Sequence, residues 1–528
     1  MRSRAFSILV DGEWRPAGGS ETFRALDPAS GDPLPGEYPI SPWSDIDEAL
    51  AAGARASFEM AVLGPGPIAR FLEVLSDRIE RRKTDLVAAA NLETALPAEP
   101  RLGSVELPRT LDQLRKAAAA CRDRSWTRAT IDTRADIRSM YGPLGGPVVI
   151  MGPNNFPYAY NALGGGDFAA ALAAGNPVLA KAHPGHPMTT RILAEIAHEV
   201  AAETGMPRAA VQLLYHFAPE DGLRLVSHPL AGATAFTGSR PSGLALKRAA
   251  DSAGKPIYLE MSSANPVFIL PGALEERPEA IAEELFQSCT LAAGQMCTKP
   301  GLAVIPNVPA AGGFIEMVRQ AFGASGPMVL LGPKVLDGLR EASARLSLKG
   351  AERLAGRREP SGPGIRFYPT LFRMSGARFL EDPSSFQVES FGTLSVIVVA
   401  KDAGEMREIA ACLDGHLTGA IYSRTDGGDD PEYDTIEPVL RTKVDRLLND
   451  RMPTGVAVSP AMNHGGPFPA TGHPGFTAVG FPAALMRFAA LRCYDHVRAG
   501  RLPPELRDAN PTGTMWRLID GDWTQRSI

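Results

Sequence analysis

The sequence predicts an α/β protein built from two parallel-sheet units in series. From about residue 145 onward, short apolar segments alternate with longer segments of helical spacing, which is the pattern of βαβ units. The 528 residues are enough for about three domains of roughly 150 residues each. The contents of 44% hydrophobic and 21% charged residues are those of a globular chain with a large core.

The first 124 residues are expected to be mostly helical. An Asp11-Gly12 pair between apolar residues predicts an initial hairpin. Three segments with helical spacing follow, at 45–61, 66–95 and 106–121. Residues 125–141 are polar and β-branched, so we expect an extended arm there rather than a core element.

The regular alternation then begins. The strands expected in the first series are Pro147–Met151, Pro177–Lys181, Val211–Tyr215, Ala233–Phe236 and Ile257–Met261. The helices expected in that series are 157–174, 187–204, 219–227 and 241–253. In the second series we expect strands Leu302–Ile305, Met328–Leu331, Leu394–Val399 and Leu417–Tyr422, with helices 277–291, 309–322, 333–346 and 403–412. The Pro- and Gly-rich stretch 453–528 has one expected helix, near 482–491, and should wrap over other parts of the protein.

Charge and cysteine content narrow the class of protein. With 54 Lys+Arg against 59 Asp+Glu the net charge is −5, which argues against nucleic acid as a partner. No apolar run approaches the roughly 18 residues of a membrane span. The basic start is followed by an apolar stretch that breaks at Asp11, so we expect no signal peptide and a cytoplasmic location. Five cysteines without paired spacing indicate a reducing compartment.

A glycine- and serine-rich turn is the first candidate binding site. Gly238 and Ser239 follow an expected strand, and Gly243 lies at the start of the next helix. Glycines let the backbone approach a phosphate, and a helix N-terminus offers free N–H groups. The turn is not a P-loop, because Leu244-Ala245 occupies the positions of its Lys and Ser/Thr. A simple turn is the alternative.

Three further residues are candidates for catalysis. Cys297 lies among Gly, Gln and Thr, which suits an accessible nucleophilic thiol, whereas Cys289, Cys412 and Cys493 suit small buried hydrophobic groups better. Glu260 ends an apolar strand, where a carboxylate is costly unless it is solvated or used. Asn155 brings an amide donor to a similar position after another strand. A helix cap is the alternative for both Glu260 and Asn155.

Five motifs, in this order, resemble those of the aldehyde dehydrogenase superfamily, and the resemblance covers essentially the whole chain. They are Pro-Asn-Asn155-Phe-Pro, Phe-Thr-Gly238-Ser239, Leu-Glu260-Met, Gly-Gln-Met-Cys297 and Glu389-Ser-Phe391-Gly. Segments beginning at Lys181, Gly294 and His464 are similar to the ketoglutarate-semialdehyde (2,5-dioxovalerate) dehydrogenase branch. That branch also includes NADP-dependent enzymes that act on long-chain aldehydes.

The resemblance implies an aldehyde dehydrogenase-like fold, with two Rossmann-like domains and a small oligomerisation arm. Residues 1–124 and 142–261 would form the dinucleotide-binding domain, and residues 262–452 the catalytic domain that carries the thiol. Residues 125–141 and 486–528 would form the arm and the C-terminal tail, leaving 453–485 as loops beside the substrate. Such enzymes assemble as homodimers or homotetramers, with no membrane partner.

The resemblance also implies a mechanism. Cys297 would attack the aldehyde, and the Asn155 amide and the Cys297 N–H would stabilise the oxyanion. Hydride transfer from the thiohemiacetal would leave a thioester, which Glu260 would hydrolyse as a general base. A thioester or ester hydrolase and a catalytically silent scaffold are the alternatives from other classes.

Cofactor contacts follow from the same resemblance. Lys181 matches the family's ribose-binding lysine. Pro184 stands where NAD-preferring members carry a Glu, so the carboxylate that would repel a 2′-phosphate is absent, and Lys181 and His183 offer donors instead. We therefore expect NADP as the cofactor, with NAD as the alternative. Gly238 and Ser239 should lie at the diphosphate, while Gly243 lets the helix approach closely. Glu389 and Phe391 should hold the nicotinamide ribose and ring. The His216-Phe217-Ala218 segment departs from the family's Gly-x-Gly at the adenine.

The resemblance also bears on the substrate. The branch implies α-ketoglutarate semialdehyde, whose carboxylate requires a cation. Tyr158 follows Asn155 without a nearby basic residue, which leaves Lys299 and Arg240 as possible anchors. Solvated surface charges are the alternative for both, and a neutral aliphatic or aromatic aldehyde is then the alternative substrate. We expect no metal at His183 and His186, which lack a third ligand, and assign no role to the remaining histidines.

Overall fold

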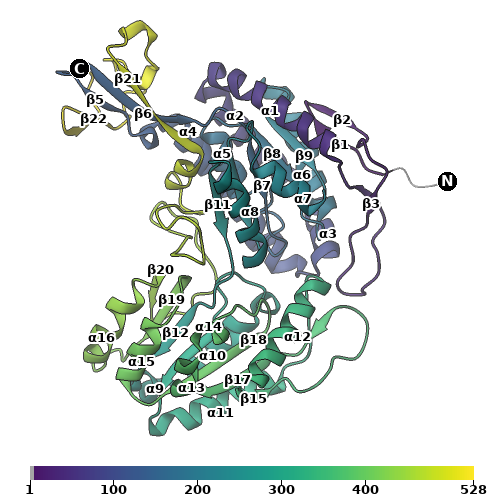
Figure 1. The fold of residues 1–528 in the computed structure, drawn as a ribbon, viewed down its shortest axis with the longest axis vertical. Helices are drawn as coiled ribbons and strands as arrows, with labels where there is room; N and C mark the ends of the chain where they lie inside the picture. The colour runs from purple at the N-terminus through teal and green to yellow at the C-terminus, as the bar shows by residue number, and fades with distance from the viewer. Residues whose placement is uncertain (1–4) are drawn as a thin grey trace.

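Two seven-stranded sheets flanked by helices form two lobes, and a five-stranded sheet forms an arm that projects from the first lobe (Figure 1). The computed structural model describes residues 5–528. Residues 1–4, on which part of the signal-peptide expectation rests, lie outside the described residues. The predicted α/β architecture of two parallel-sheet units with a small arm is confirmed. No helix in the described part of the chain is long and apolar enough to cross a membrane.

The first sheet has the order β11-β10-β7-β8-β9-β1-β2. Its strands are β1 (Ile8–Val10), β2 (Glu13–Arg15), β7 (Val148–Met151), β8 (Val178–Lys181), β9 (Val211–Leu214), β10 (Ala233–Thr237) and β11 (Ile257–Glu260). The predicted hairpin forms at Asp11-Gly12, and the five predicted strands run parallel to one another. Since β8 and β10 lie on opposite sides of β7, the chain order reverses beside β7, where ligands bind in open α/β sheets.

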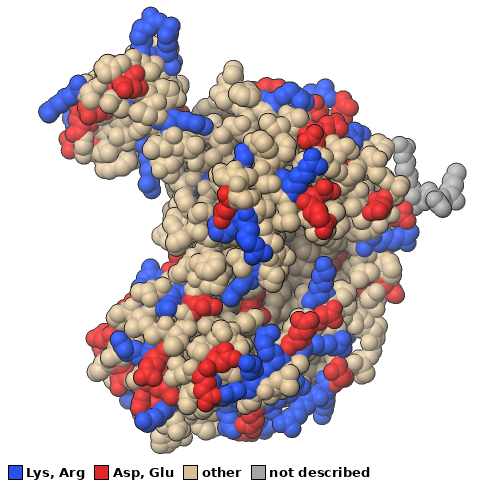
Figure 2. Space-filling model, viewed as in Figure 1, with Lys and Arg blue, Asp and Glu red and all other residues tan. Residues whose placement is uncertain are grey.

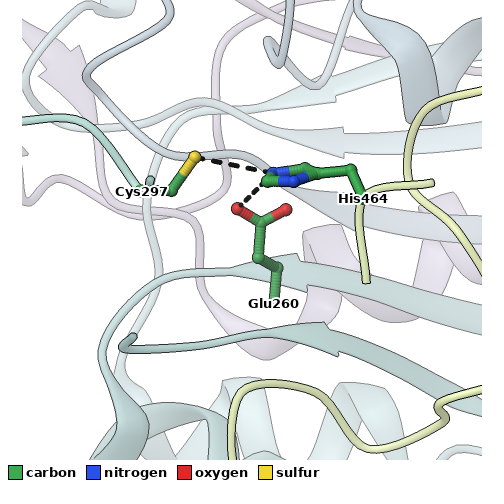
Figure 3. Close-up of side chains that lie close together, drawn as sticks. All are labelled: Glu260, Cys297 and His464. Atoms are coloured by element: carbon green, nitrogen blue, oxygen red, sulfur yellow. Dashed lines mark hydrogen bonds and ion pairs between the residues drawn. The ribbon is translucent and has the colours of Figure 1, made fainter. Parts of the chain in front are cut away.

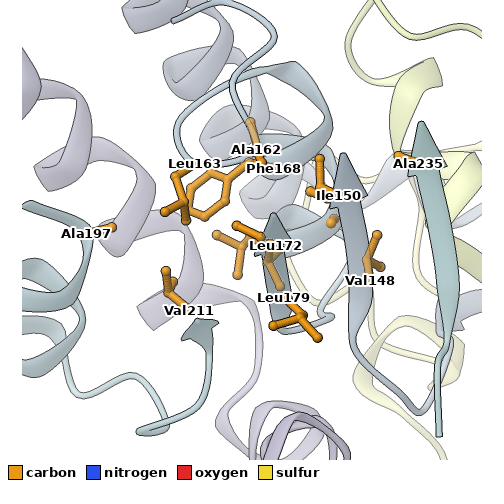
Figure 4. Close-up of a cluster of buried hydrophobic side chains, with 14 of the residues drawn as sticks. Val148, Ile150, Ala162, Leu163, Phe168, Leu172, Leu179, Ala197, Val211 and Ala235 are labelled. Atoms are coloured by element: carbon orange, nitrogen blue, oxygen red, sulfur yellow. The ribbon is translucent and has the colours of Figure 1, made fainter. Parts of the chain in front are cut away.

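Helices cover both faces of this sheet. They are α1 (Trp43–Leu63), α2 (Pro65–Arg81), α3 (Lys83–Thr94), α4 (Leu107–Asp123), α5 (Gly166–Ala173), α6 (Pro187–Thr204), α7 (Pro219–Val226) and α8 (Arg240–Ser252), with the irregular turns η1 (Ala98–Glu106) and η2 (Ser125–Thr127) around α4. In the core, Val148 of β7 and Leu179 of β8 lie close to Phe168 and Leu172 of α5 (Figure 4). All four side chains are fully buried, as expected for a parallel sheet covered on both faces.

The second sheet has the order β15-β17-β18-β13-β12-β19-β20. Its strands are β12 (Pro266–Ile269), β13 (Leu302–Pro306), β15 (Glu352–Ala355), β17 (Thr370–Ser375), β18 (Leu394–Ala400), β19 (His416–Tyr422) and β20 (Val444–Asn449). Its helices are α9 (Pro271–Glu276), α10 (Pro278–Thr290), α11 (Pro309–Ala324), α12 (Pro333–Leu348), α13 (Gly376–Glu381), α14 (Pro383–Phe386), α15 (Ala403–Ala411) and α16 (Asp430–Leu440), and the turn η3 (Leu291–Gly294) follows α10. Strands β12, β15, β17 and β20 were not predicted, because they are short or carry charged residues.

Three sequence expectations are wrong. The expected helix 157–174 is reduced to α5, because the Asn161 side chain bonds the local backbone and Gly164 adopts a φ of 90°. The expected strand Met328–Leu331 is only β14 (Met328–Val329), which pairs with β16 (Arg366–Phe367) outside the main sheet. The expected helix 482–491 is the short turn η4 (Ala483–Phe488) followed by a strand.

That strand joins the arm. The arm sheet has the order β21-β6-β5-β22-β23, with β5 (Thr130–Asp132), β6 (Ile137–Pro143), β21 (Ala489–Asp495), β22 (Arg517–Ile519) and β23 (Asp522–Thr524). The turns η5 (Ala499–Arg501) and η6 (Pro504–Leu506) connect β21 to β22, and a further small sheet pairs β3 (Thr22–Phe23) with β4 (Tyr38–Pro39). Basic and acidic side chains are interspersed over the face shown in Figure 2, and neither sign forms a continuous field there.

Replacing Phe168 by Ala tests the core of the first lobe. The substitution leaves a cavity beneath β7 and β8, and we expect the free energy of unfolding to fall by about 3–5 kcal/mol. Phe58→Ala is the matched control, because Phe58 is 73% exposed. Urea unfolding followed by tryptophan fluorescence measures both, since all five tryptophans lie outside the second lobe. Equal midpoints for the two variants would contradict the described core.

Candidate active site

Four neighbouring strands of the first sheet carry predicted site residues at their carboxyl ends. Glu260 ends β11, Gly238 follows β10, Asn155 follows β7, and Lys181 ends β8. These strands are adjacent in the order β11-β10-β7-β8 and all run parallel, so the four residues lie along one edge of the sheet. The sheet therefore brings together residues that are up to 105 positions apart in sequence. It does so beside β7, where the strand order reverses.

Cys297 reaches this edge from the second lobe, on a tightly folded loop. Ala292, Ala293 and Gly294 all adopt positive φ angles, of 51°, 56° and 68°. A Cβ at Gly294 would lie 2.4 Å from the Gly392 carbonyl oxygen, so only glycine fits there. The Asn265 amide donates to the carbonyl of Cys297 at 2.9 Å, which fixes the loop from the other side. The thiol is thus held on strained but well-supported backbone.

His464 points its imidazole at both the Cys297 thiol and the Glu260 carboxylate (Figure 3). Its Nε2 is 3.5 Å from the Cys297 Sγ and 3.0 Å from the Glu260 Oε1. The His464 side chain is 1% exposed and that of Glu260 is 7% exposed, so the acid-base pair is shielded from solvent, while Cys297 is partly exposed. From the sequence alone His464 has no role of its own, but the structure places it in this cluster. The similarity of the segment that begins at His464 was a signal for it.

A segment without regular structure brings His464 to β11. Strand β11 is at the edge of its sheet, and its free side pairs with the segment near Thr471 through a Glu260–Thr471 bridge. The Met261 N–H also donates to the Ala470 carbonyl at 2.8 Å. The main-chain N–H of His464 donates to Thr477 Oγ1 at 2.8 Å, which closes the segment on itself. These bonds position the imidazole over the end of β11.

The pKa values of the thiol and the carboxylate are shifted in opposite directions, although burial acts to raise both. Burial raises the pKa of the Cys297 thiol well above its usual value, and the Glu260 charge raises it further. Burial also acts to raise the pKa of Glu260, but the neighbouring His464 outweighs it, so the pKa of Glu260 is lowered. The resting site therefore holds a protonated thiol beside an ionised carboxylate. The thiol must lose its proton before the sulfur can act as a nucleophile, and Glu260 and His464 both lie beside it.

Glu260 has room for a further proton partner. Its Oε2 is buried and forms no hydrogen bond with the described residues. Glu260 and His464 line a cavity together with Thr237, Thr471 and Arg487. A carboxylate with one oxygen bonded to His464 and the other free at a cavity can accept a proton from either side.

Asn155 lies against the nucleophile loop. Its Nδ2 donates to the Gln295 carbonyl at 2.9 Å, two residues before Cys297. An amide carries two N–H groups, so one remains for a reacting oxygen. Arg101 donates to the Asn155 carbonyl at 2.9 Å and fixes its main chain. The structure thus brings Asn155, Glu260 and Cys297 together, as the sequence predicted.

Lys181 and His183 lie together at the end of β8. Burial lowers the pKa of Lys181 to about 8, and the Lys334 charge contributes. The His183 Nδ1 accepts a hydrogen bond from the Gly185 N–H at 3.0 Å, so the Nε2 carries the proton of the neutral ring. Burial lowers the pKa of His183 well below its usual value. The pair therefore offers an amine and an imidazole N–H as donors.

The turn between β10 and α8 has the features of a phosphate site. Ser239 is the N-cap of α8, but its side chain does not cap the helix and contacts Ser242 Oγ instead. Gly238 lies at the adjoining end of β10 and donates its N–H to the Glu260 carbonyl at 3.0 Å. A Cβ at Gly243 would lie 2.7 Å from Met261 Sδ, so this glycine allows α8 to approach β11. An uncapped helix N-terminus at a strand end suits an anionic ligand.

Glu389 and Phe391 face the first lobe from the second. Phe391 is half-buried and packs against the core of the first lobe. Burial raises the pKa of Glu389 to about 7, although Lys299 and a Ser262 hydrogen bond act to lower it. Both residues lie on the turn whose Gly392 contacts the nucleophile loop. They are thus placed at the junction of the lobes, close to Cys297 in the fold.

The two expected substrate contacts are corrected. The Lys299 amine is buried and donates to the carbonyls of Ser390 and Leu394 at 3.0 and 2.6 Å, so it supports the Glu389 turn instead of anchoring a carboxylate. Tyr158 is fully buried, and its hydroxyl donates to the Leu86 carbonyl at 2.7 Å. Arg240, the other possible anchor, is half-buried and its guanidinium lies 3.6 Å from the Asp414 carboxylate, so it already has an acidic partner.

The expectation for the other cysteines is partly wrong. Cys289 is buried, as expected, but Cys412 and Cys493 are exposed. Cys121 is also buried. Cys297 has intermediate exposure.

The cluster of Glu260, Cys297 and His464 has the chemistry of a metal site. One ligand atom from each residue lies within 4.8 Å of the others, and zinc binds carboxylate, thiolate and imidazole. The same closeness suits proton transfer between the three groups. The expectation of a site that works without metal stays a prediction.

Comparisons with known proteins find relatives of the whole chain. The aldehyde dehydrogenase family model matches residues 14–427. The alpha-ketoglutaric semialdehyde dehydrogenase 2 of Azospirillum brasilense is 37% identical over 518 residues, which are 96% of this chain and 97% of that protein. The alpha-ketoglutaric semialdehyde dehydrogenase of Acinetobacter baylyi is 32% identical over 529 residues, which are 98% of each chain.

Solved structures share the fold. The lactaldehyde dehydrogenase of Escherichia coli superposes with a TM-score of 0.79 at 21% identity, over 93% of this chain and 98% of that chain. The NAD+ complex of an aldehyde dehydrogenase from Bacillus cereus gives a TM-score of 0.78 at 20% identity, over 93% and 96% of the two chains. At these identities the likeness concerns the fold.

Replacing Glu260 by Gln tests the electrostatics of the cluster. The substitution removes a negative charge that raises the pKa of Cys297, so the thiol pKa should fall and alkylation by iodoacetamide at pH 8 should become faster. Mass spectrometry of the digested protein follows the Cys297 peptide, and the exposed Cys412 in the same digest is the internal reference. An unchanged ratio of the two labelling rates from pH 7 to 10 would show that Glu260 does not act on the thiol.

Proposed function

The chain belongs to the aldehyde dehydrogenase family and is an NAD(P)-dependent oxidoreductase, and we propose that it oxidises α-ketoglutarate semialdehyde to 2-oxoglutarate. The cluster of Cys297, His464 and Glu260 carries this proposal, because it supplies a nucleophile, a proton acceptor and a shielded site. The names of the two relatives at 37% and 32% identity support the choice of substrate, since both are aligned over nearly their whole length.

The first step is attack by sulfur. Cys297 gives its proton to the Glu260–His464 pair, and the thiolate adds to the aldehyde carbon to form a thiohemiacetal. The proton must move in the same step, because burial disfavours a free thiolate. The His464 Nε2 lies 3.5 Å from the sulfur and 3.0 Å from the Glu260 Oε1, so both members of the pair are beside the thiol.

The second requirement is a site for the oxyanion. The free N–H of the Asn155 amide and the main-chain N–H of Cys297 serve as its donors. Asn155 is held by Gln295 and Arg101, so this donor is fixed before the substrate arrives. Preorganised donors of this kind contribute roughly 3–4 kcal/mol each to transition-state stabilisation.

The last step is hydrolysis of the thioester that remains on Cys297 once the hydride has left. Glu260 removes a proton from the attacking water, and its lowered pKa keeps it ionised at neutral pH. The free Oε2 and the adjoining cavity give this carboxylate a second position for the proton.

The residues at the sheet edge fit a dinucleotide. The uncapped N-terminus of α8 at Ser239 suits a diphosphate, and Lys181 and His183 suit the adenosine ribose. Glu389 and Phe391 would hold the nicotinamide end beside Cys297. When bound, the nicotinamide supplies the hydride acceptor.

NADP is the preferred form in this proposal, with NAD as the alternative. The family position that carries a Glu in NAD-preferring members is Pro184, so no carboxylate at that position repels a 2′-phosphate. The Lys181 amine and the His183 Nε2–H provide donors beside it. The lowered pKa of Lys181, about 8, still leaves the amine mostly charged at pH 7.

Assembly and location complete the proposal. We infer a homodimer or homotetramer joined through the arm, because Leu491 on the edge strand β21 is 60% exposed and Trp523 on the opposite edge strand is 55% exposed. Unpaired strand edges with apolar side chains suit pairing with a second copy. The scattered cysteines keep the cytoplasm as the proposed compartment.

Two substitutions separate the chemical steps. Cys297→Ala should abolish production of reduced nicotinamide, because no covalent adduct can form. Glu260→Gln should release a burst of up to one reduced nicotinamide per site and then slow turnover by roughly 10²- to 10⁴-fold. Stopped-flow absorbance measures both, with Cys412→Ala as the control at an exposed cysteine. Near-normal turnover by Cys297→Ala would refute the covalent mechanism.

Pro184→Glu tests the choice of cofactor. The new carboxylate should repel the 2′-phosphate and lower kcat/KM for NADP at least tenfold, while kcat/KM for NAD is kept or increased. Pro184→Gln, of equal length and without the charge, is the matched control. A wild-type enzyme that strongly prefers NAD would contradict the NADP proposal.

A further inference from the structure

Two arginines from different parts of the first and second lobes bind one loop. Arg109 of α4 donates through Nη1 to the Val456 carbonyl at 2.5 Å. Arg446 of β20 donates through Nη1 to the Gly455 carbonyl at 2.8 Å and through Nη2 to the Pro453 carbonyl. Because Gly455 and Val456 are consecutive, the two guanidinium groups converge on the same short stretch of backbone.

Neither arginine has an acidic partner. In the described part of the chain, no carboxylate lies within 4.0 Å of either guanidinium, and the Nε of each is buried without a hydrogen bond. Asp445, the neighbour of Arg446, instead accepts hydrogen bonds from Asn463 and Gly465. Other partly buried arginines do have carboxylate partners: Arg101 with Glu106, Arg124 with Glu505 and Arg487 with Asp167.

Burying a cation without a counter-charge is unfavourable, and a pair of such cations more so. Both side chains are only half-buried, so an anion can reach them from the solvent side. Burial lowers the pKa of Arg446, which is the sign of a charge that the protein does not fully compensate. An anionic ligand would compensate it.

The loop that holds both arginines is joined to the nucleophile. The Gly455 N–H donates to Thr298 Oγ1 at 3.1 Å, and Thr298 follows Cys297 directly. Arg109 also donates to the Tyr160 hydroxyl at 3.2 Å, and the Tyr160 ring lies 6.2 Å from that of His464. The two cations are therefore neighbours of the thiol through two independent sets of contacts.

The surface between them and the thiol is apolar. One buried cluster there consists of Phe156, Ala159, Tyr160, Met296 and Val479, with Ala292, Val456, Val458 and Met462 packed against it. An aldehyde with a short carbon chain and a terminal anion matches such a wall, because the chain contacts the apolar side chains while its charged end reaches the arginines.

We propose that Arg109 and Arg446 form an anion subsite that binds the carboxylate of an acid-bearing aldehyde substrate. A guanidinium group binds a carboxylate through two parallel N–H bonds. In this subsite the guanidinium groups of Arg109 and Arg446 flank the substrate carboxylate. The subsite supplies the cation that Lys299 does not. It rests on the proposed function for the reaction and narrows the substrate class to aldehydes that carry a carboxylate.

The test compares the ratio of kcat/KM for α-ketoglutarate semialdehyde to kcat/KM for pentanal, a neutral aldehyde with the same number of carbons. In Arg109→Met and Arg446→Met this ratio should fall roughly 10- to 100-fold, mainly through KM. Arg446→Lys, which keeps the charge, should recover part of it. Arg451→Met is the matched control, because Arg451 is exposed on the same loop and should leave the ratio unchanged.

A second measurement needs no acid-bearing substrate. Glutarate should inhibit oxidation of pentanal by the wild-type enzyme competitively, and this inhibition should weaken at least tenfold in both Met variants. Lack of glutarate inhibition in the wild type, or an unchanged substrate ratio in the variants, would overturn the subsite. Equal losses for both aldehydes with a lower Tm would overturn it too, by showing a purely structural role.

The outcomes also separate this inference from the proposed function. A wild-type enzyme that uses succinic semialdehyde but not α-ketoglutarate semialdehyde, and depends on both arginines to do so, would support the subsite and refute the proposed substrate. Efficient turnover of α-ketoglutarate semialdehyde that is independent of both arginines would support the proposed substrate and refute the subsite.

Discussion

The buried contact between Glu260 and His464 is the constraint on which the site depends. A carboxylate at the end of an apolar strand cannot remain ionised without a partner, and the 3.0 Å contact with His464 supplies one from 204 residues away. The same imidazole is 3.5 Å from Cys297, so one side chain stabilises the base and lies beside the nucleophile. The bridge between β11 and Thr471 is what holds His464 there, which makes the irregular segment after β20 as important to the site as either sheet.

The two lobes contribute unlike parts to this arrangement. The first sheet supplies Asn155, Lys181 and Glu260 from the carboxyl ends of adjacent parallel strands, so their spacing is set by the sheet itself. The second lobe supplies Cys297 on a loop held by positive-φ backbone, by close packing against Gly392 and by the Asn265 amide. Chemistry therefore occurs where the lobes meet. A small shift of one lobe against the other would separate the sulfur from its proton acceptor.

The sequence predicted the parts of this account that depend on local pattern. The sequence could identify three catalytic candidates because each differs in polarity or reactivity from the residues around it: Cys297, Glu260 and Asn155. It could identify the parallel strands of the first sheet because their apolar runs are continuous. His464 could not be found from periodicity, since it lies in a segment without helix or strand, far in sequence from its partners. Lys299 was misassigned because sequence does not tell where a side chain points, and its amine turns to the Ser390 and Leu394 carbonyls. Arg109 was missed because it lies in a predicted helix among other charged residues, and Arg446 because its strand β20 was not predicted.

The central claim is that Cys297 carries the acyl group during turnover. Rapid-quench mass spectrometry of the wild-type enzyme, mixed with α-ketoglutarate semialdehyde and NADP, tests this most directly. Within the first turnover, we expect the peptide with Cys297 to gain the mass of the aldehyde less two hydrogens, one leaving as hydride and one as the thiol proton. This adduct should decay as 2-oxoglutarate appears. Product formation with no such adduct, or with an adduct on another residue, would contradict the account.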